Sequence, residues 1–404
     1  MAEAPPEIKK IGDLLNQYIE KHKKIVKIII GRLTQPGENY GSEIMKVDMV
    51  LKDENSGDEE ELYLVAKMIP ESDLYKEIFN VQVSFVSEMR FYDTVVPILE
   101  DFRKRKGAKV KDIYPKFYGG RKNLNIQGGA VDTNAVLLMD NIKIKGYENL
   151  DRHKGFDLKG AKVVLEAIAY FHVTPLALKL QEPGTFEEKI KPHLACFLPG
   201  RTPEKEQAIK ERYISFCHRS MSFVSECEEC IPALPLVEKC IGKWEPIRRN
   251  DLREPFSTIL HTDVWVNNIM VKNCQSDIDI KLVDFQFCTY DSPVEDLMFF
   301  LITSVPLDVL KNHLDELLQS YHKYFIQELE NLKCSTDQFG YGKLLVEIKE
   351  CIHNTVFRCL WFIPTVVLGE KGTKSDVTKI VPSQAAKEKI WWMVQEFYRR
   401  GWLD

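Results

Sequence analysis

The chain has 404 residues, of which 44% are apolar or aromatic and 28% are charged, a composition typical of a globular protein of two or three domains or one bilobal unit. This composition excludes wholesale disorder and a disulfide-stapled mini-protein. The net charge is −5, from 55 Lys and Arg against 60 Asp and Glu, so the chain lacks the excess of positive charge that is typical of a dedicated nucleic-acid binder.

Membrane and secretion signals are missing from the sequence pattern. No apolar run approaches the roughly 18 residues of a membrane span, and the first residues, MAEAPPEIKK, lack the apolar segment of a signal peptide. Ten irregularly spaced cysteines then indicate reduced thiols and a cytoplasmic protein. The one CxxC pair, Cys227 and Cys230, has no second pair or His partners, so a helix with two cysteines one turn apart is favoured over zinc.

Up to residue 139 the pattern predicts strands and one long helix. Alternating or β-branched runs indicate strands over 25–30, 42–52 and 62–69. Helical spacing of apolar residues follows over 72–99, and two more strands are expected over 113–118 and 135–139. We therefore expect an antiparallel sheet with one long helix as a first domain, residues 1–139.

From residue 140 the pattern becomes mainly helical. Helices are expected over 158–172, 204–230, 307–330, 340–360 and 384–401, with short strands over 258–260 and 280–283. The sequence thus predicts an α+β, two-lobed protein whose second domain spans residues 140–404. A cleft between two such lobes is a usual place for a ligand.

One loop carries the residues of a phosphoryl-transfer site. Asp263 and Asn268 lie in a polar loop between apolar strands, and a second apolar strand ends at Asp284. Transfer from ATP needs a carboxylate to accept the hydroxyl proton and oxygen ligands for Mg²⁺. Each residue alone is better explained by a turn or a helix cap. Their joint pattern predicts Asp263 as the base, with Asn268 and Asp284 as metal ligands.

The first lobe offers groups for the phosphates. Lys67, in a Val-Ala-Lys strand, is placed to reach the α- and β-phosphates, and Glu88 on the following helix could pair with it. The loop containing Gly37, Asn39, Gly41 and Ser42 could cover phosphates with backbone N–H groups. A half-exposed lysine, a solvated glutamate and an ordinary hairpin turn are the alternatives.

These pieces together resemble the ecdysteroid kinase-like family of the protein-kinase-like superfamily, relatives of aminoglycoside and choline kinases. The resemblance rests on ENYGS at 38–42, YPKFYG at 114–119, LMDNI at 138–142, HTDVWVNNIM at 261–270, VDFQ at 283–286 and PVEDLMFFL at 293–301. It implies a bilobal protein-kinase-like fold, ATP and Mg²⁺ as cofactors, and a hinge at Asp140 and Ile142 that holds the nucleotide. The implied acceptor is a small, largely apolar alcohol, with an ecdysteroid hydroxyl as the family's example.

Departures from the family pattern keep other functions open. Thr262 stands where the family usually has glycine, Gln286 follows Asp284-Phe285, and no Ala-Pro-Glu segment follows, which argues against a peptide substrate. The alternatives are a kinase of another alcohol (a xenobiotic, or a choline-like or aminoglycoside-like compound) and a non-catalytic pseudokinase. The oligomeric state is not predicted.

Two polar residues and a set of apolar ones receive structural roles. His261 is expected to shape the loop through backbone hydrogen bonds. Asp296, in the first turn of a helix, suits the helix dipole, and the resemblance implies that it also braces the loop. Seven residues could line an apolar acceptor pocket, although core packing is the more common role and is favoured for most of them: Phe197, Leu198, Phe216, Phe223, Trp361, Phe362 and Trp391.

Overall fold

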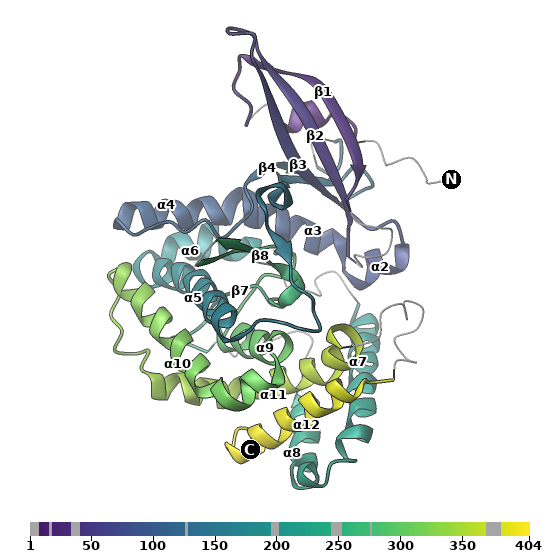
Figure 1. Cartoon of the computed structure of the whole chain (residues 1–404), viewed down its shortest axis with the longest axis vertical. Helices are drawn as coiled ribbons and strands as arrows, with labels where there is room; N and C mark the ends of the chain where they lie inside the picture. Colours follow the sequence, from purple (N-terminus) through teal and green to yellow (C-terminus); the bar gives the residue numbers. More distant parts are fainter. Residues whose placement is uncertain are drawn as a thin grey trace.

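A computed structural model describes residues 8–15, 18–33, 41–125, 128–194, 202–243, 253–274, 277–368 and 381–404. The sheet projects from one end of the molecule and the helices form the larger body beneath it (Figure 1). The chain therefore has the bilobal α+β architecture that the sequence predicts. Gly37, Asn39, Phe197 and Leu198 lie outside the described residues.

The N-terminal lobe is a five-stranded antiparallel sheet in the order β1-β2-β3-β5-β4. Its strands are β1 (Lys23–Arg32), β2 (Glu43–Asp53), β3 (Glu59–Met68), β4 (Phe117–Arg121) and β5 (Val136–Asp140), and helix α1 (Ile11–Leu15) packs beside them. On β2, Met45, Val47 and Met49 are buried and alternate with more exposed polar residues, which is the period-2 pattern of a sheet with one covered face. The three predicted N-terminal strands and the strand ending near 139 are confirmed.

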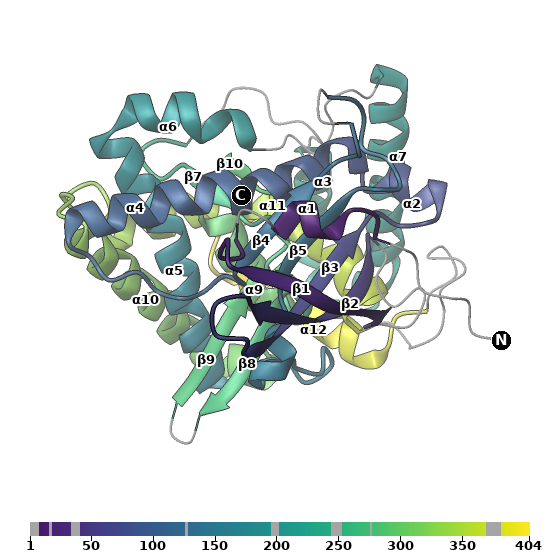
Figure 2. The same cartoon turned by 90° about the horizontal axis from the view of Figure 1, so that it is seen from above.

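The prediction of a single helix over 72–99 is wrong in two respects: the segment is interrupted at Asn80, and its helical part continues to Lys106. The segment is divided into α2 (Asp73–Ile78), α3 (Val81–Arg90), a π-helical turn η1 (Phe91–Val95) and α4 (Val96–Lys106). The break falls at Asn80, whose φ of +46° is left-handed, a conformation that asparagine tolerates better than most residues. Seen from above, α3 and α4 form one long rod beside the sheet (Figure 2).

The strand predicted over 113–118 begins later than expected: β4 starts only at Phe117. Pro115 has no N–H to give to a strand ladder. The preceding backbone instead bonds to the other lobe: Ile113 O accepts from the Leu282 N–H at 2.8 Å, and Asp112 O accepts from Lys281 Nζ at 2.6 Å. This segment therefore joins the lobes before the sheet resumes.

The C-terminal lobe is mainly helical. Its helices are α5 (Leu158–Gln181), α6 (Pro183–Lys189), α7 (Pro203–Val224), α8 (Leu234–Lys243), α9 (Val294–Ser304), α10 (Leu307–Asn331), α11 (Tyr341–Phe362) and α12 (Gln384–Arg399). Short 3-10 segments are η2 (Ile142–Lys145), η3 (Lys191–His193), η4 (Glu228–Ala233) and η5 (Val266–Asn268), and η6 (Ile363–Val367) is a second π-helical turn. The five predicted helices are present, although α5 is longer and α7 shorter than expected.

Two small sheets hold the candidate site loops. Strands β6 (Glu148–Asn149), β8 (Ile269–Cys274) and β9 (Asp277–Leu282) form one, and β7 (Thr258–Leu260) pairs with β10 (Thr289–Asp291) in the other. Strands β8 and β9 form a hairpin, with Ile269 opposite Leu282 and Cys274 opposite Asp277. The domain boundary predicted at 139 and 140 falls on the last two residues of β5.

The prediction that Cys227 and Cys230 share one helix is wrong. Cys227 has an extended backbone and precedes η4, which contains Cys230 and Pro232. Across the described part of the chain no cluster of three or more His, Cys, Asp or Glu could hold a metal ion, so nothing there favours zinc. Helix α8, which follows, was not predicted.

The prediction that no segment approaches a membrane span needs one correction, because α5 is a described helix that is long and apolar enough to cross a membrane by length and composition. Within its most apolar window, 78% of the residues are buried inside the protein. Its neighbours include α10, α4 and β7. This burial is typical of the core helix of a folded domain.

The rod of α3 and α4 is fixed to the C-terminal lobe by a buried ion pair and an aromatic stack. Arg103 Nη2 donates to Glu328 Oε2 of α10 at 2.7 Å, its Nη1 donates to Thr174 Oγ1 of α5 at 2.9 Å, and both charged side chains are buried. Phe91 stacks on Phe285 with ring centroids 4.0 Å apart. The rod thus belongs to the body of the protein as much as to the sheet.

Lys389 of α12 is buried and donates to Val305 O at 2.7 Å, and burial lowers the pKa of its ammonium to about 8. Since the unfolded lysine keeps its proton up to about pH 10.4, the unfolded state binds more protons between pH 8 and 10.4, and this residue's unfavourable contribution fades as pH rises through that window. We expect Lys389→Met to raise the free energy of unfolding at pH 7 by about 1–2 kcal/mol, after the lost hydrogen bond.

Urea denaturation of both proteins between pH 7 and 10 measures this effect, and the advantage of the variant should shrink above pH 8. Lys387→Met on the same helix is the matched control, because Lys387 pairs with Glu226 near the surface. A gain for Lys389→Met that is independent of pH would contradict the explanation.

Candidate active site

A cavity of about 1610 Å³ lies between the lobes and collects nearly all the described candidate residues. Those lining it are Gly41, Ser42, Lys67, Glu88, Asp140, Ile142, Asp263, Asn268 and Asp284. At Gly41 an added Cβ would meet the Phe79 ring at 3.2 Å, so the backbone approaches the cavity wall closely there. The two lobes thus bring the predicted groups together, as the contact between Lys67 and Asp284, 217 residues apart in the sequence, illustrates.

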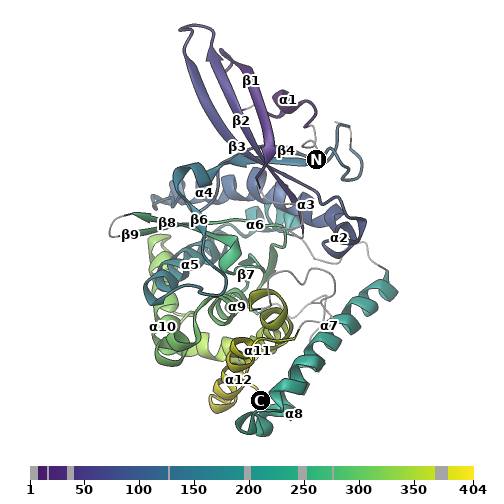
Figure 3. The same cartoon turned by 45° about the vertical axis from the view of Figure 1, so that its right-hand side comes forward.

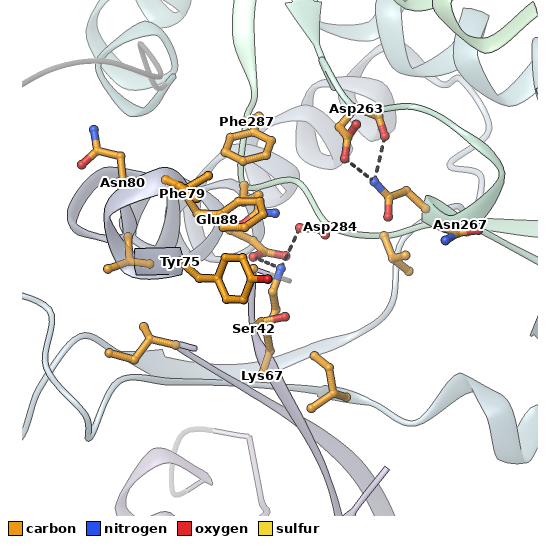
Figure 4. Close-up of a pocket in the computed structure, with 18 of the residues that line it drawn as sticks. Ser42, Lys67, Tyr75, Phe79, Asn80, Glu88, Asp263, Asn267, Asp284 and Phe287 are labelled. Atoms are coloured by element: carbon orange, nitrogen blue, oxygen red, sulfur yellow. Dashed lines mark hydrogen bonds and ion pairs between the residues drawn. The ribbon is translucent and has the colours of Figure 1, made fainter. Parts of the chain in front are cut away.

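The predicted pairing of Lys67 and Glu88 is confirmed as a contact. Lys67 Nζ lies 2.5 Å from Glu88 Oε2 and 2.7 Å from Asp284 Oδ1, and Lys67 and Glu88 are buried (Figure 4). Burial opposes the ammonium charge, but the two carboxylates outweigh it and raise the pKa of Lys67 above its usual value. The lysine is therefore a fixed positive charge at the centre of the cavity.

Asp263 and Asn268 orient one another across the loop. Asn268 Nδ2 donates to Asp263 Oδ2 and to Asp263 O, both at 2.8 Å (Figure 4). Because both partners accept, the amide nitrogen is assigned unambiguously, and the amide oxygen Oδ1 is turned away from Asp263. Burial, together with the nearby Asp284 charge, raises the pKa of the Asp263 carboxyl to about 7.

His261 has the structural role that the sequence predicts. Its Nε2 lies 2.9 Å from Val283 O, and the Asp263 N–H points at its Nδ1 at 3.2 Å. A carbonyl only accepts and an N–H only donates, so Nε2 carries the proton and Nδ1 is bare. Burial lowers the pKa of the imidazole, which keeps it neutral. His261 therefore links the loop of Asp263 to the strand end before Asp284.

Asp296 braces the same loop, as expected. Its carboxylate accepts the His261 N–H at 2.6 Å and the Thr262 N–H at 2.9 Å, and His172 Nε2 lies 3.3 Å away. Burial alone would raise the pKa of this carboxyl, but the His172 contact and the backbone donor lower it below its usual value. Helix α9 carries Asp296 in its first turn and thereby fixes the position of the loop that contains Asp263.

Two residues of the site have a left-handed backbone, Thr262 at φ +67° and Asp284 at φ +70°. Such a φ costs of the order of 1–2 kcal/mol for a residue with a Cβ. The hydrogen bond between Thr262 Oγ1 and Thr289 Oγ1, 2.9 Å long, offsets part of this cost. The structure thus shows how threonine is accommodated at a left-handed position where glycine would carry no strain.

We expect Thr262→Gly to be more stable than Thr262→Ala by about 1 kcal/mol, because both lose the hydroxyl bond but only glycine removes the strain. Chemical denaturation midpoints of the two variants measure the difference directly. An alanine variant as stable as the glycine variant would show that the backbone at this position is not strained.

Arg358 of α11 is a site residue that sequence reasoning missed. Its guanidinium donates to Thr262 O and lies 3.7 Å over the Phe299 ring, and its charge lowers the pKa of Asp263, partly opposing burial. No local motif marks this arginine, since it reaches the loop only through the packing of α11 against α9.

The apolar acceptor-pocket candidates divide into two groups. Phe216, Trp361 and Phe362 line the cavity, joined by Tyr213 and Trp265, which were not predicted to line it. Phe223 and Trp391 do not line it, because Trp391 Nε1 donates to Phe223 O at 2.8 Å where α12 packs on α7. Those two residues therefore have the core-packing role.

The arrangement is suited to a nucleotide and a hydroxyl acceptor. Apolar side chains from both lobes line the cavity: Ile44, Val65, Met139, Ile142, Met270 and Val283. Lys67, Asp284, Asn268 and Asp263 line the same cavity. Asp284 and the turned Asn268 Oδ1 are hard oxygen donors, too few to hold Mg²⁺ alone but sufficient together with phosphate oxygens and water. The residues therefore fit a Mg²⁺–ATP complex.

The bilobal fold and this site define the class, a protein-kinase-like small-molecule phosphotransferase. The sequence matches the model of the ecdysteroid kinase-like family over residues 36–334, well over half of the chain. The chain belongs to that family, and its acceptor group is accordingly an alcohol.

Comparisons with solved structures and with curated sequences give less information than the family match does. The fold is similar to a Plasmodium vivax ethanolamine kinase (11% identity, TM-score 0.41, 93% of this chain and 84% of that one). It is also similar to a microcompartment-associated aminopropanol kinase (10% identity, TM-score 0.38, 93% and 94%). No curated protein sequence matches the chain significantly.

Proposed function

We propose that this protein transfers the γ-phosphoryl group of ATP to a hydroxyl of a small, largely apolar molecule, most specifically an ecdysteroid. The observation that carries the proposal is one cavity that holds Lys67, Asp284, Asn268 and Asp263 and continues into a wall of aromatic rings. The choice of an ecdysteroid as acceptor is supported by the name of the ecdysteroid kinase-like family alone.

Each residue of the site has a separate role in the phosphoryl transfer. Lys67, held by Glu88, neutralises phosphate oxygens, while Asp284 and Asn268 would hold Mg²⁺, which would supply further positive charge to the phosphates. Asp263 orients the acceptor hydroxyl and takes its proton as the new oxygen–phosphorus bond forms and the bond between the γ-phosphorus and the β-phosphate oxygen breaks, which releases ADP. Asn268, His261 and Asp296 keep the Asp263 loop in place, so that little reorganisation is needed during the reaction.

A peptide acceptor is not expected. Between Asp284 and the start of α9 at Val294 the chain forms β10, which pairs with β7. This short connection offers no extended segment on which a peptide could align.

All nine described cysteines are free thiols, which supports a reducing, cytoplasmic location as part of the proposal.

The test is incubation of the purified protein with ATP, Mg²⁺ and single alcohols, followed by mass detection of the phosphorylated product. The panel contains ecdysteroids, other apolar alcohols, ethanolamine, choline, an aminoglycoside and a peptide mixture. The proposal expects product from the ecdysteroids or other apolar alcohols and none from peptides. Transfer to a peptide, or transfer only to the amines, would overturn it.

Lys67→Met is expected to raise the KM for ATP at least tenfold, because it removes the buried charge that meets the phosphates. Steady-state kinetics with varied ATP measure this change. Lys46→Met, on the neighbouring strand β2, removes the same group where it pairs with Asp48, and should leave the KM unchanged. A normal KM in the Lys67 variant would show that this strand does not hold the nucleotide.

A further inference from the structure

Asn141, which directly follows β5, has a buried polar atom without a partner. The residue is only 3% exposed. Its side-chain carbonyl oxygen, Oδ1, accepts no hydrogen bond from the described residues. Leaving a buried polar atom unpaired is unfavourable, and folded proteins pair nearly all of them. The oxygen is therefore placed for a donor that a ligand brings.

The local structure does not use this side chain. Asn141 is the N-cap residue of η2, where asparagine normally bonds to the first N–H groups of the helix, but it makes no side-chain cap. Its backbone is satisfied, since its N–H donates to Tyr63 O at 3.1 Å and its carbonyl accepts from the Ile144 N–H at 3.3 Å. The preceding side chain, Asp140, pairs with Lys145. The Asn141 amide is thus the polar side chain that this segment keeps for the cavity.

Strand pairing places the Asn141 side chain on the cavity side of the sheet. In the ladder of β3 and β5, Lys67 lies opposite Leu137. Two positions along, Val65 lies opposite Met139. Paired residues share a face of the sheet, and so do residues two positions apart on one strand. Asn141 follows Met139 by two positions, and both line the cavity.

The same register gives the separation between Asn141 and the lysine that meets the phosphates. Asn141 lies four positions along the chain from Leu137, the partner of Lys67. At about 3.3 Å per residue this amounts to about 13 Å. In a nucleotide whose α- and β-phosphates contact Lys67, the ribose lies between the phosphates and the base. The base is then the part of the nucleotide that comes nearest to Asn141.

The surroundings of Asn141 suit the flat faces of a base. Strand β3, which carries Val65, lies above β8, which carries Met270 (Figure 3). Ile142, the residue after Asn141, is buried and packs with Met270 and Val283 in one apolar cluster. All of these side chains line the cavity. A flat ring between them would have apolar contacts from both lobes and one polar contact from Asn141.

A carbonyl oxygen needs a hydrogen-bond donor, and ATP has few. The ring nitrogens of its adenine and its phosphate oxygens accept, so its donors are the 6-amino group of the base and the ribose hydroxyls. Guanine carries a carbonyl oxygen in place of that amino group, and two acceptors cannot bond to one another. The separation from Lys67 and the apolar surroundings both favour the amino group over the ribose.

We infer that the side-chain carbonyl of Asn141 accepts a hydrogen bond from the 6-amino group of adenine and thereby selects ATP over GTP. The inference rests on the proposed function, which places ATP in this cavity. It assigns the choice of base to one side chain, so a single substitution should remove that choice.

The probes are ATP, GTP and the triphosphate of purine riboside, which is ATP without its 6-amino group, together with 2′-deoxy-ATP and 3′-deoxy-ATP. Calorimetry with Mg²⁺ gives the dissociation constant of each probe for the full chain and for Asn141→Leu, which keeps the size of the side chain and removes the amide. Asn149→Leu is the matched control. Asn149 also lines the cavity, but its amide donates to Asn267 O at 2.7 Å.

We expect the unaltered protein to bind ATP about 3- to 10-fold more tightly than GTP or the purine riboside triphosphate, the range for one neutral hydrogen bond. In Asn141→Leu the advantage of ATP over the purine riboside triphosphate should disappear, because ATP alone loses a contact. Asn149→Leu should keep that advantage. Removal of a ribose hydroxyl should change binding by the same factor in all three proteins.

The first comparison needs no variant: a purine riboside triphosphate that binds the unaltered protein as well as ATP does would overturn the inference. It is also overturned if Asn141→Leu keeps the preference for ATP, if Asn149→Leu loses it equally, or if Asn141→Leu removes instead the effect of a missing ribose hydroxyl. The proposed function fails separately. In that case the preference for ATP is as expected, but no alcohol in the panel is phosphorylated.

Discussion

Replacing Asp263 by asparagine is expected to lower turnover by about 10²- to 10⁴-fold while ATP binding stays nearly unchanged. The amide cannot take a proton from the acceptor hydroxyl, and this explains the loss. It can still accept the hydrogen bond from Asn268 Nδ2, which is 2.8 Å long in the structure, so the loop should keep its shape. Single-turnover kinetics measure the chemical step, and the ATP-induced rise in melting temperature measures nucleotide binding.

Two results would test the assignment of Asp263 as the base. Turnover near that of the unaltered protein would remove Asp263 from the mechanism. Asn267→Asp is a useful companion variant, since Asn267 lines the cavity beside the loop but contributes its backbone carbonyl, not its side chain, to the contact with Asn149. An added carboxylate there should not substitute for Asp263 in a double variant.

Replacing Asp284 by asparagine should remove both turnover and the Mg²⁺-dependent part of ATP binding. The change deletes a carboxylate that is placed to hold the cation and leaves Lys67 with Glu88 as its remaining carboxylate partner. Asparagine is chosen over alanine because the backbone here is left-handed, with φ +70°, and asparagine tolerates that conformation. We expect turnover to fall at least 10²-fold.

The measurement is ATP binding by calorimetry with Mg²⁺ and with EDTA. The unaltered protein should bind more tightly with Mg²⁺, and the variant should not distinguish the two conditions. Asp277→Asn on β9 makes the same charge change at an exposed position and should behave as the unaltered protein. If Mg²⁺ still strengthens ATP binding in Asp284→Asn, this residue is not a metal ligand.

Local patterns predicted the strands because alternation is a property of neighbouring residues. On β2 the buried and exposed side chains follow the sequence directly, and the pairing with β3 requires only a turn between them. The division of the long helix was missed because apolar spacing continues across Asn80, and only its backbone conformation shows the break. The later start of β4 likewise depends on Pro115 and on bonds to β9.

The candidate site was predictable where a motif carried it. Asp263, Asn268 and Asp284 lie within a short stretch of known spacing, and Lys67 was found through its strand. Arg358 and the Tyr213 ring were not predictable in the same way, because they reach the site through the packing of α11 and α7. Such contacts depend on where whole helices lie, which the spacing of apolar residues does not encode.

The attachment of the α3–α4 rod to the helical lobe has a consequence for how this enzyme is controlled. Carrying Glu88 away from Lys67 would mean unstacking Phe91 from Phe285 and separating the buried Arg103 from Glu328. Breaking such a buried pair costs about 3–5 kcal/mol, so a disengaged form would be populated at well under one molecule in a hundred. Output should then follow the abundance of the enzyme and of its acceptor, with synthesis and turnover of the protein as the points of regulation.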